Sequence, residues 1–292
     1  MIKFKKYIIY PMQFLFFLLI YYFFKILPVR IASSLSGKIF KILGPLTKNN
    51  KTVIRNLILV NKNDKNTYNI SKKIWENLGK TIAELSHLNK ITKKNNLIKI
   101  RGKKYIDNII KNNEQVIFIA IHQSNWEILA PTLIAFGIKI NSVYRHINNS
   151  LINKFILAVR KSAYNSKESL LSPKGKKSAQ DMILSIKNGY SIALLIDQKD
   201  SSGKDIPLFG IPAKTQTGFL KLAKKFNLKI YPIENKRLNN INFEIIIHKP
   251  IILKNYNKNF DEKDIMLKIH KIIENWIKKT PESWLWQHKR WG

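Results

Sequence analysis

The sequence predicts an α/β protein, built as a mixed, mostly parallel sheet flanked by helices and preceded by an N-terminal membrane-anchoring helix and a helical lead-in. Three observations predict it. An aromatic-rich apolar run lies near the N-terminus, and apolar residues then recur at spacings of three and four. From about residue 96, short apolar runs alternate with helical segments. We therefore expect an anchor at residues 1–27, a lead-in at 28–95 and an α/β domain at 96–292.

The first segment has an apolar core from Phe14 to Phe24 that ends at Lys25. Extending it back to Tyr7 brings it close to the roughly 20 residues that a membrane span needs, although Pro11 and Gln13 interrupt it. We predict a membrane anchor. The alternatives are a signal peptide processed near residues 32–34 and a buried core helix. Basic residues on both flanks leave the orientation open.

The later segments follow from periodicity. In the lead-in, Ile74, Trp75, Leu78, Ile82 and Leu85 recur with a helical spacing. The run at 116–121 is continuously apolar and mostly β-branched, which is typical of a buried parallel strand. Predicted strands are 97–100, 116–121, 140–144, 192–196, 229–233 and 243–247, and predicted helices are 126–136, 150–163, 176–187, 218–226 and 261–277.

Composition restricts the chemistry. The chain has 52 Lys and Arg against 18 Asp and Glu, a formal net charge of +34. Either an anionic partner or a general preference for Lys accounts for this excess. In both cases the charge attracts anionic lipids, phosphates and acidic carrier proteins. The chain has no cysteine, which excludes a cysteine nucleophile and thiolate metal ligands. The histidines show no metal-ligand spacing, so we expect no metal and no cofactor.

The strongest candidate for catalysis is the pair His122 and Glu127. His122 follows the predicted buried strand, at the edge where open α/β sheets bind ligands. Ser124 or Asn125 can cap the next helix, which places Glu127 in its first turn. A carboxylate beside the imidazole would fix its tautomer and increase its basicity, so that it could take a proton from a hydroxyl group. The alternative is a Glu that only benefits from the helix dipole.

Further candidates come from loops expected at the same sheet edge. Asp197 and Gln198 follow the strand at 192–196 and either position a substrate or cap a turn. The segment with Arg145 and Asn149 follows the strand at 140–144. Arg145 and Arg160 are rare arginines that could stabilise an oxyanion, bind a phosphate or pair with a carboxylate. Three tryptophans near the C-terminus suit either a lipid–water interface or a packing cluster.

Five ordered blocks of the chain resemble the lipid A biosynthesis acyltransferases, the late lauroyl/myristoyl family within the lysophospholipid acyltransferase-like superfamily. The family pattern H-x-G-N-W-E is matched with Ser124 in place of Gly, and the later P-F-F-G is matched with Leu208 in place of one Phe. The matching blocks are His122–Glu127, Tyr144–Arg145, Asp197–Gln198, Pro207–Gly210 and Pro281–Trp291. In the second block, Ser150 stands where the family has Pro after Asn149.

The resemblance implies acyl transfer from an acyl carrier protein thioester to a hydroxyl of a phosphorylated, acylated glucosamine disaccharide. It implies His122 and Glu127 as the general-base dyad, with Arg145, Asn149, Arg160, Asp197 and Gln198 as substrate-binding residues. It also implies a bacterial inner-membrane location, with the active site facing the cytoplasm.

Two alternatives remain at this point. One is acyl transfer to another acceptor, such as a lysophospholipid, an aminolipid or a mannosylated lipid. The other is a membrane-associated basic protein that binds nucleic acid, although the chain has no recognised nucleic-acid-binding motif.

Overall fold

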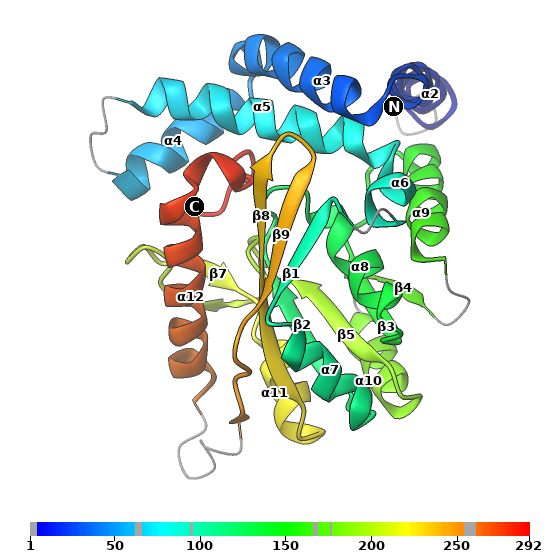
Figure 1. Cartoon of the computed structure of the whole chain (residues 1–292). Helices are drawn as coiled ribbons and strands as arrows, with labels where there is room; N and C mark the ends of the chain where they lie inside the picture. Colours follow the sequence, from blue (N-terminus) through cyan, green and yellow to red (C-terminus); the bar gives the residue numbers. More distant parts are fainter. Residues whose placement is uncertain (1–4, 62–65, 94–95, 166–168, 176, 254–260) are drawn as a thin grey trace.

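A seven-stranded sheet forms the centre of the protein, with helices on both of its faces (Figure 1). The computed structural model describes residues 5–61, 66–93, 96–165, 169–175, 177–253 and 261–292. The strand order is β1-β9-β8-β2-β5-β3-β4, and all neighbours are parallel except β8 and β9, which form an antiparallel hairpin. The strands are β1 Ile98–Arg101, β2 Val116–Ala120, β3 Ile140–Tyr144, β4 Leu170–Pro173, β5 Ser191–Leu195, β8 Lys229–Asn239 and β9 Asn242–Ile247. The predicted mixed, mostly parallel α/β fold is confirmed.

The helices fall into an N-terminal group and a group that covers the sheet. The first group is η1 Lys5–Ile9, α2 Tyr10–Ile26, α3 Val29–Leu43, η2 Gly44–Leu46, α4 Asn50–Asn61, α5 Thr67–Leu85 and α6 Leu88–Lys93. The second group is α7 Lys103–Lys111, η3 Trp126–Ile128, α8 Leu129–Ala135, α9 Ser150–Tyr164, α10 Ser178–Lys187, α11 Gly218–Lys225, α12 Glu262–Lys279 and η5 Pro281–Ser283.

Alternation along β2 shows how the core is divided. Ile117 and Ile119 face a core built with α10, α11 and α12, whereas Val116 and Phe118 face one built with α6, α7 and α8. Successive side chains of a strand point to opposite faces, so a strand buried on both sides needs a continuous apolar run. That is why the run at 116–121 could be predicted as a buried strand from the sequence.

Several elements differ from the sequence prediction. The edge strand β4 was not predicted, because Leu-Leu-Ser-Pro is short and has no alternation. A small antiparallel pair, β6 Lys204–Asp205 and β7 Lys214–Thr215, was also missed. The predicted helix at 126–136 begins as the 3₁₀ turn η3, and β8 runs beyond residue 233 to form the hairpin with β9. The predicted start of α10 at residue 176 lies outside the described residues.

The N-terminal apolar helix is confirmed over Lys6–Ile26, where its length and composition would allow a membrane crossing. Only 11% of its most apolar window is buried, which excludes the buried-core alternative. In Figure 1, α2 is seen almost end-on at the top of the molecule, while α3 runs across the view above α5. The lead-in therefore forms a helical layer on the α/β domain.

Helix α12 carries a buried histidine whose ring is bonded to a backbone carbonyl. His270 is 2% exposed, and its Nδ1–H donates to the carbonyl oxygen of Pro207 at 2.6 Å. Burial, together with the charge of Arg290, lowers the pKa of His270 to about 4. The folded protein therefore holds a neutral imidazole under conditions in which the unfolded chain is protonated.

We predict that His270 makes the protein acid-sensitive. Its pKa is lower in the folded state, so between about pH 6.5 and pH 4 the unfolded chain binds more protons and stability falls as the pH falls. The expected loss at pH 5 is about 2 kcal/mol. His270→Asn should remove this contribution, as measured by urea unfolding at pH 7 and pH 5. An equal pH-dependent loss in both proteins would contradict the prediction.

Candidate active site

The carboxyl ends of β2 and β5 bring His122 and Asp197 together. These strands are parallel neighbours with Ala120 opposite Leu195, so the loops that follow them leave the same sheet edge, as the sequence predicted. The Nδ1 of His122 lies 2.8 Å from Oδ1 of Asp197, and the backbone N–H of His122 donates to Oδ2 at 3.1 Å. A carboxylate only accepts, so Nδ1 carries the ring proton and Nε2 is left as an acceptor. The amide Nε2 of Gln198 lies 3.3 Å from that nitrogen.

The carboxylate partner of His122 is therefore Asp197, not the predicted Glu127. The side chain of Asp197 is fully buried. Burial on its own would raise the pKa of Asp197, but the charge of His122 and its hydrogen bond hold that pKa well below the usual range, with help from His288 and Trp284. Asp197 is thus ionised at neutral pH and can stabilise a positive charge on His122.

Residues near the C-terminus complete this arrangement. The indole Nε1–H of Trp284 donates to Oδ2 of Asp197 at 2.7 Å. The tail is tied to the His122 loop by two backbone bonds, from Leu285 N–H to the His122 carbonyl and from Ser124 N–H to the Ser283 carbonyl. Gln123 and Trp284 form an antiparallel bridge between the two segments. The tail is therefore held against the loop that carries His122.

Glu127 occupies a different environment from the one predicted. Its carboxylate forms a two-pronged ion pair with Arg160 of α9, at 2.8 Å to Nε and 2.6 Å to Nη2, and accepts from Trp126 Nε1 at 3.1 Å. Burial alone would raise the pKa of Glu127, but the charge and hydrogen bonds of Arg160 hold it below its usual value, and the charge of His122 acts in the same direction. Glu127 is thus an ionised group close to His122 without bonding to it.

A cavity of about 430 Å³ opens beside these groups. One part of its lining is polar and comes from α9 and from the carboxyl ends of β2, β3 and β5 with the loops that follow them. The rest is apolar and extends between the sheet and helices α8 and α9. The polar or charged lining includes His122, Glu127, Tyr144, Arg145, Arg160 and Gln198, and the apolar lining includes Phe118, Ala120, Leu129, Leu133, Ile156, Ala193 and Leu195. A reactive polar edge joined to an apolar chamber suits a substrate with a long hydrocarbon portion.

Two predicted site residues do not line this cavity: Asp197, which is fully buried against His122, and Asn149. The Oδ1 of Asn149 caps α9 by accepting from Leu151 N–H and Ile152 N–H, and its Nδ2 donates to the Tyr10 carbonyl and to Gln13 Oε1. Asn149 therefore joins the start of α9 to α2 and does not line the cavity. Among the described residues, no group of three or more metal-binding side chains lies close enough to hold a metal ion.

The chain also matches a known protein family. A model of the family described as bacterial lipid A biosynthesis acyltransferase matches residues 1–292. The chain belongs to this family. The protein is therefore an acyltransferase of lipid A biosynthesis, and the nucleic-acid-binding alternative is set aside. No curated protein matches the sequence.

Three of the sequence blocks that match the acyltransferase family lie together in the structure. The first, third and last blocks supply His122, Asp197 and Trp284, which form one hydrogen-bonded chain. The lipid–water interpretation of the tail is wrong, because Trp284, Trp286 and Trp291 are all buried and Trp284 packs against both of the others. The packing-cluster alternative is confirmed. Sequence reasoning missed the contact of Trp284 with Asp197, since nothing in the spacing of the two blocks indicates it.

Ser124 stands at a position whose backbone conformation suits the glycine of the family pattern. It has φ +52°, in the left-handed region that favours glycine. Its side chain is fully buried, and its Oγ accepts from the backbone N–H of Arg237. The cap of the following turn is Asn125, whose Oδ1 accepts from Glu127 N–H. Ser124 is not one of the residues that line the cavity.

A second buried network supports the same loop from the lead-in. Glu84 of α5 is fully buried and pairs with Arg237 of β8. It also accepts from Asn125 Nδ2 at 2.9 Å and from Ser33 Oγ of α3 at 2.6 Å. The Glu84 carboxylate thus joins the helical layer to the loop that carries His122. No sequence pattern predicted this contact.

We predict that Ser124→Gly is more stable than Ser124→Ala by about 1 kcal/mol, because both lose the Arg237 hydrogen bond but only glycine relieves the left-handed strain. Thermal unfolding of the two variants in detergent measures the difference. Both should retain acyl transfer. Equal stabilities would contradict the prediction.

We predict that Trp284→Phe lowers kcat roughly tenfold, the value of one hydrogen bond to Asp197. The matched control is Trp286→Phe. Trp286 is also buried and loses a bond of the same length, but that bond is to the Pro281 carbonyl. Steady-state rates of acyl transfer compare the two, and equal losses would mean that Trp284 acts only through packing.

Proposed function

We propose that the protein transfers a fatty acyl chain from an acyl carrier protein thioester to a hydroxyl of a phosphorylated lipid A precursor, at the cytoplasmic face of the bacterial inner membrane. The observation that carries the chemistry is the His122–Asp197 pair, which leaves Nε2 as an acceptor at the cavity edge. Family membership supports an acyltransferase of lipid A synthesis. The donor, the acceptor and the roles of individual residues belong to the proposal.

His122 acts as the general base. Its Nε2 takes the proton of the acceptor hydroxyl as the oxygen attacks the thioester carbonyl, and the resulting imidazolium is stabilised by Asp197. Collapse of the tetrahedral intermediate breaks the C–S bond, and the proton passes from Nε2 to the departing thiolate. The products are an ester and the carrier thiol, with no covalent enzyme intermediate.

The remaining cavity residues position the substrates. The amide of Gln198 lies 3.3 Å from Nε2 of His122, where the reacting atoms must meet, and we assign it as a donor to the developing oxyanion. Arg145 is exposed and lines the cavity, which suits it to an acceptor phosphate. Arg160 is held by Glu127, so this pair fixes the shape and charge of the wall beside His122. Glu127 adds negative charge near the imidazolium.

The surface charge supports the same partners. A formal net charge of +34 attracts both a phosphorylated lipid and an acidic carrier protein. The apolar part of the 430 Å³ cavity would receive the acyl chain between the sheet and α8.

The test combines product analysis with three variants. The purified chain in detergent is incubated with carrier proteins bearing labelled acyl chains of several lengths and with either a phosphorylated glucosamine-based precursor or a lysophospholipid, and products are identified by mass spectrometry. We expect an ester on the glucosamine-based lipid. Acylation of the lysophospholipid alone would overturn the proposed acceptor.

We predict that His122→Ala abolishes transfer and that Asp197→Asn lowers kcat by roughly 10²–10⁴-fold with little change in KM. Glu127→Gln keeps the shape of the side chain and should lower kcat less than Asp197→Asn. Circular dichroism controls for folding. If Glu127→Gln abolished transfer while Asp197→Asn kept full activity, Glu127 would be the partner of His122 during turnover and the assignment of Asp197 would fail.

A further inference from the structure

We propose that α2 does not cross the bilayer but lies flat on it together with α3, so that the two helices form one docking face for an anionic phospholipid membrane. This deepens the membrane location proposed above and does not depend on the acyl-transfer chemistry. Four observations carry it: the contacts along α2, the relative directions of the two helices, their exposed apolar residues and the local charge.

The body of the enzyme covers one side of α2 along most of its length. Near its start, Asn149 of α9 donates to the Tyr10 carbonyl at 2.9 Å, and near its end, His87 Nε2 lies 2.8 Å from the Phe24 carbonyl. Between them, Phe155 of α9 packs against Phe14, Phe17 and Tyr21 with ring centroids 6.1, 5.7 and 4.8 Å apart.

These contacts are incompatible with a simple crossing. Tyr10 and Phe24 are separated by about 21 Å along the helix, against a hydrocarbon thickness of about 30 Å. If α2 ran along the membrane normal, α9 would be drawn into the hydrocarbon beside it. That helix carries exposed Lys154 and Lys161, which a bilayer interior disfavours.

The opposite side of α2 is an exposed apolar stripe. Met12, Phe16, Leu19 and Phe23 are 51% to 67% exposed and follow the spacing i, i+4, i+7, i+11, which places them on one helix face. Because the protein covers the other side, this helix needs no polar face to lie in the interface.

Helix α3 continues the apolar surface in another direction. Ile31, Ile39, Ile42 and Leu43 are exposed along it, and Leu46 of η2 is 79% exposed. Figure 1 shows α2 almost end-on while α3 runs across the view, both at the same side of the molecule. A bilayer parallel to both axes contacts both apolar surfaces, whereas a bilayer crossed by α2 would leave that of α3 in water.

The charge of this region favours anionic lipid. The first 63 residues of the chain contain no Asp or Glu. Lys25, Arg30 and Lys38 are exposed beside the apolar residues. Basic side chains at the edge of an apolar face are typical of interfacial helices on anionic membranes.

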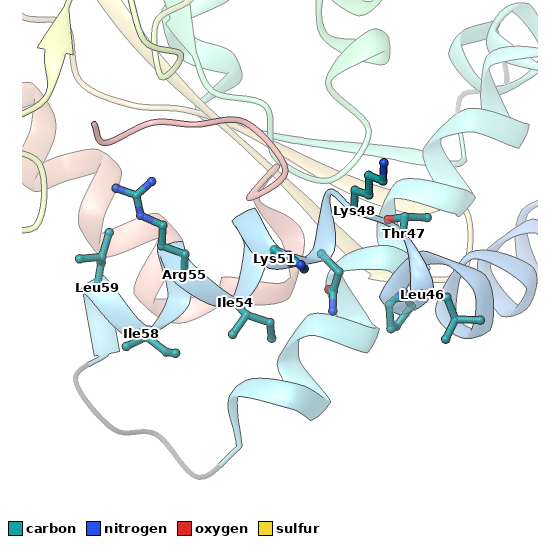
Figure 2. A pocket seen from close by; sticks show the side chains of 10 residues that line it. Leu46, Thr47, Lys48, Lys51, Ile54, Arg55, Ile58 and Leu59 are labelled. Atoms are coloured by element: carbon teal, nitrogen blue, oxygen red, sulfur yellow. The ribbon is translucent and has the colours of Figure 1, made fainter.

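A groove at the end of α3 fits the same partner. It has a volume of about 690 Å³ and lies between η2 and α4. Figure 2 shows Ile54, Ile58 and Leu46 pointing to one side, away from Lys48 and Arg55. This separation of apolar and basic side chains suits a phospholipid, with its phosphate near the cations and its chain on the apolar side.

The absence of cysteine makes a direct test possible, because single cysteines can be introduced and spin-labelled. The sites are Met12→Cys, Phe16→Cys, Leu19→Cys and Phe23→Cys on α2, with Ile42→Cys and Leu46→Cys after it. Leu184→Cys is the control, since Leu184 is 60% exposed on α10. The full chain is bound to vesicles of phosphatidylcholine and phosphatidylglycerol, and label depth is measured by oxygen and nickel-chelate accessibility.

We expect all four α2 labels and both α3-side labels at a similar depth of about 5–10 Å, with Leu184→Cys in water. Labels at positions 16 and 19 near the bilayer centre, with positions 42 and 46 in water, would show a crossing helix and overturn the proposal. Positions 42 and 46 in water with α2 uniformly shallow would also overturn it, because α3 would not be docked.

A binding measurement gives a second check. Ile42→Asp combined with Leu46→Asp should weaken vesicle binding at least tenfold, whereas Leu184→Asp should not change it. In detergent, the double variant should keep its acyl transfer, which separates failure of docking from failure of the proposed chemistry. Unchanged binding of the double variant would overturn the docking role of α3.

Discussion

The carboxylate of Asp197 is the constraint on which the sheet edge at His122 depends. It is fully buried, and it accepts hydrogen bonds from the ring and backbone N–H groups of His122 and from the indole N–H of Trp284. A buried charge is tolerated only when it is hydrogen-bonded on all sides. The strands β2 and β5 must therefore stay in register and the tail must stay docked, because displacing either would leave the charge unsatisfied.

Glu84 is a second buried carboxylate whose hydrogen-bond partners come from different parts of the molecule. It joins α3, α5, the His122 loop and β8 through Ser33, Asn125 and Arg237. The helical lead-in is thus not a separate appendage to the α/β domain. Its position relative to the loop that carries His122 is fixed by the buried ion pair of Glu84 and Arg237. Removing only one partner of such a pair is strongly destabilising, because the other charge is left buried without a partner.

The sequence predicted the strands whose burial on both faces requires a continuous apolar run, and it placed His122 and Asp197 at one sheet edge. It did not predict their pairing, which depends on β2 and β5 being neighbours and on the direction of each side chain. Glu127 was assigned to His122 from spacing alone, but its carboxylate pairs with the partly buried Arg160 of α9. Contacts between distant segments, such as Trp284 with Asp197 or Glu84 with Arg237, leave no local pattern and could not be predicted.

Two consecutive residues of helix α9 contact different parts of the molecule. Phe155 supports α2, and Ile156, the next residue, lines the cavity. Substitutions in α9 that change the volume of the cavity would therefore also disturb the packing of α2. Leu129 and Leu133 line the cavity from α8, whereas the ring contacts that hold α2 come from Phe155 of α9. If the cavity receives the acyl chain as proposed, changes in the accepted chain should accumulate on α8 more readily than on α9.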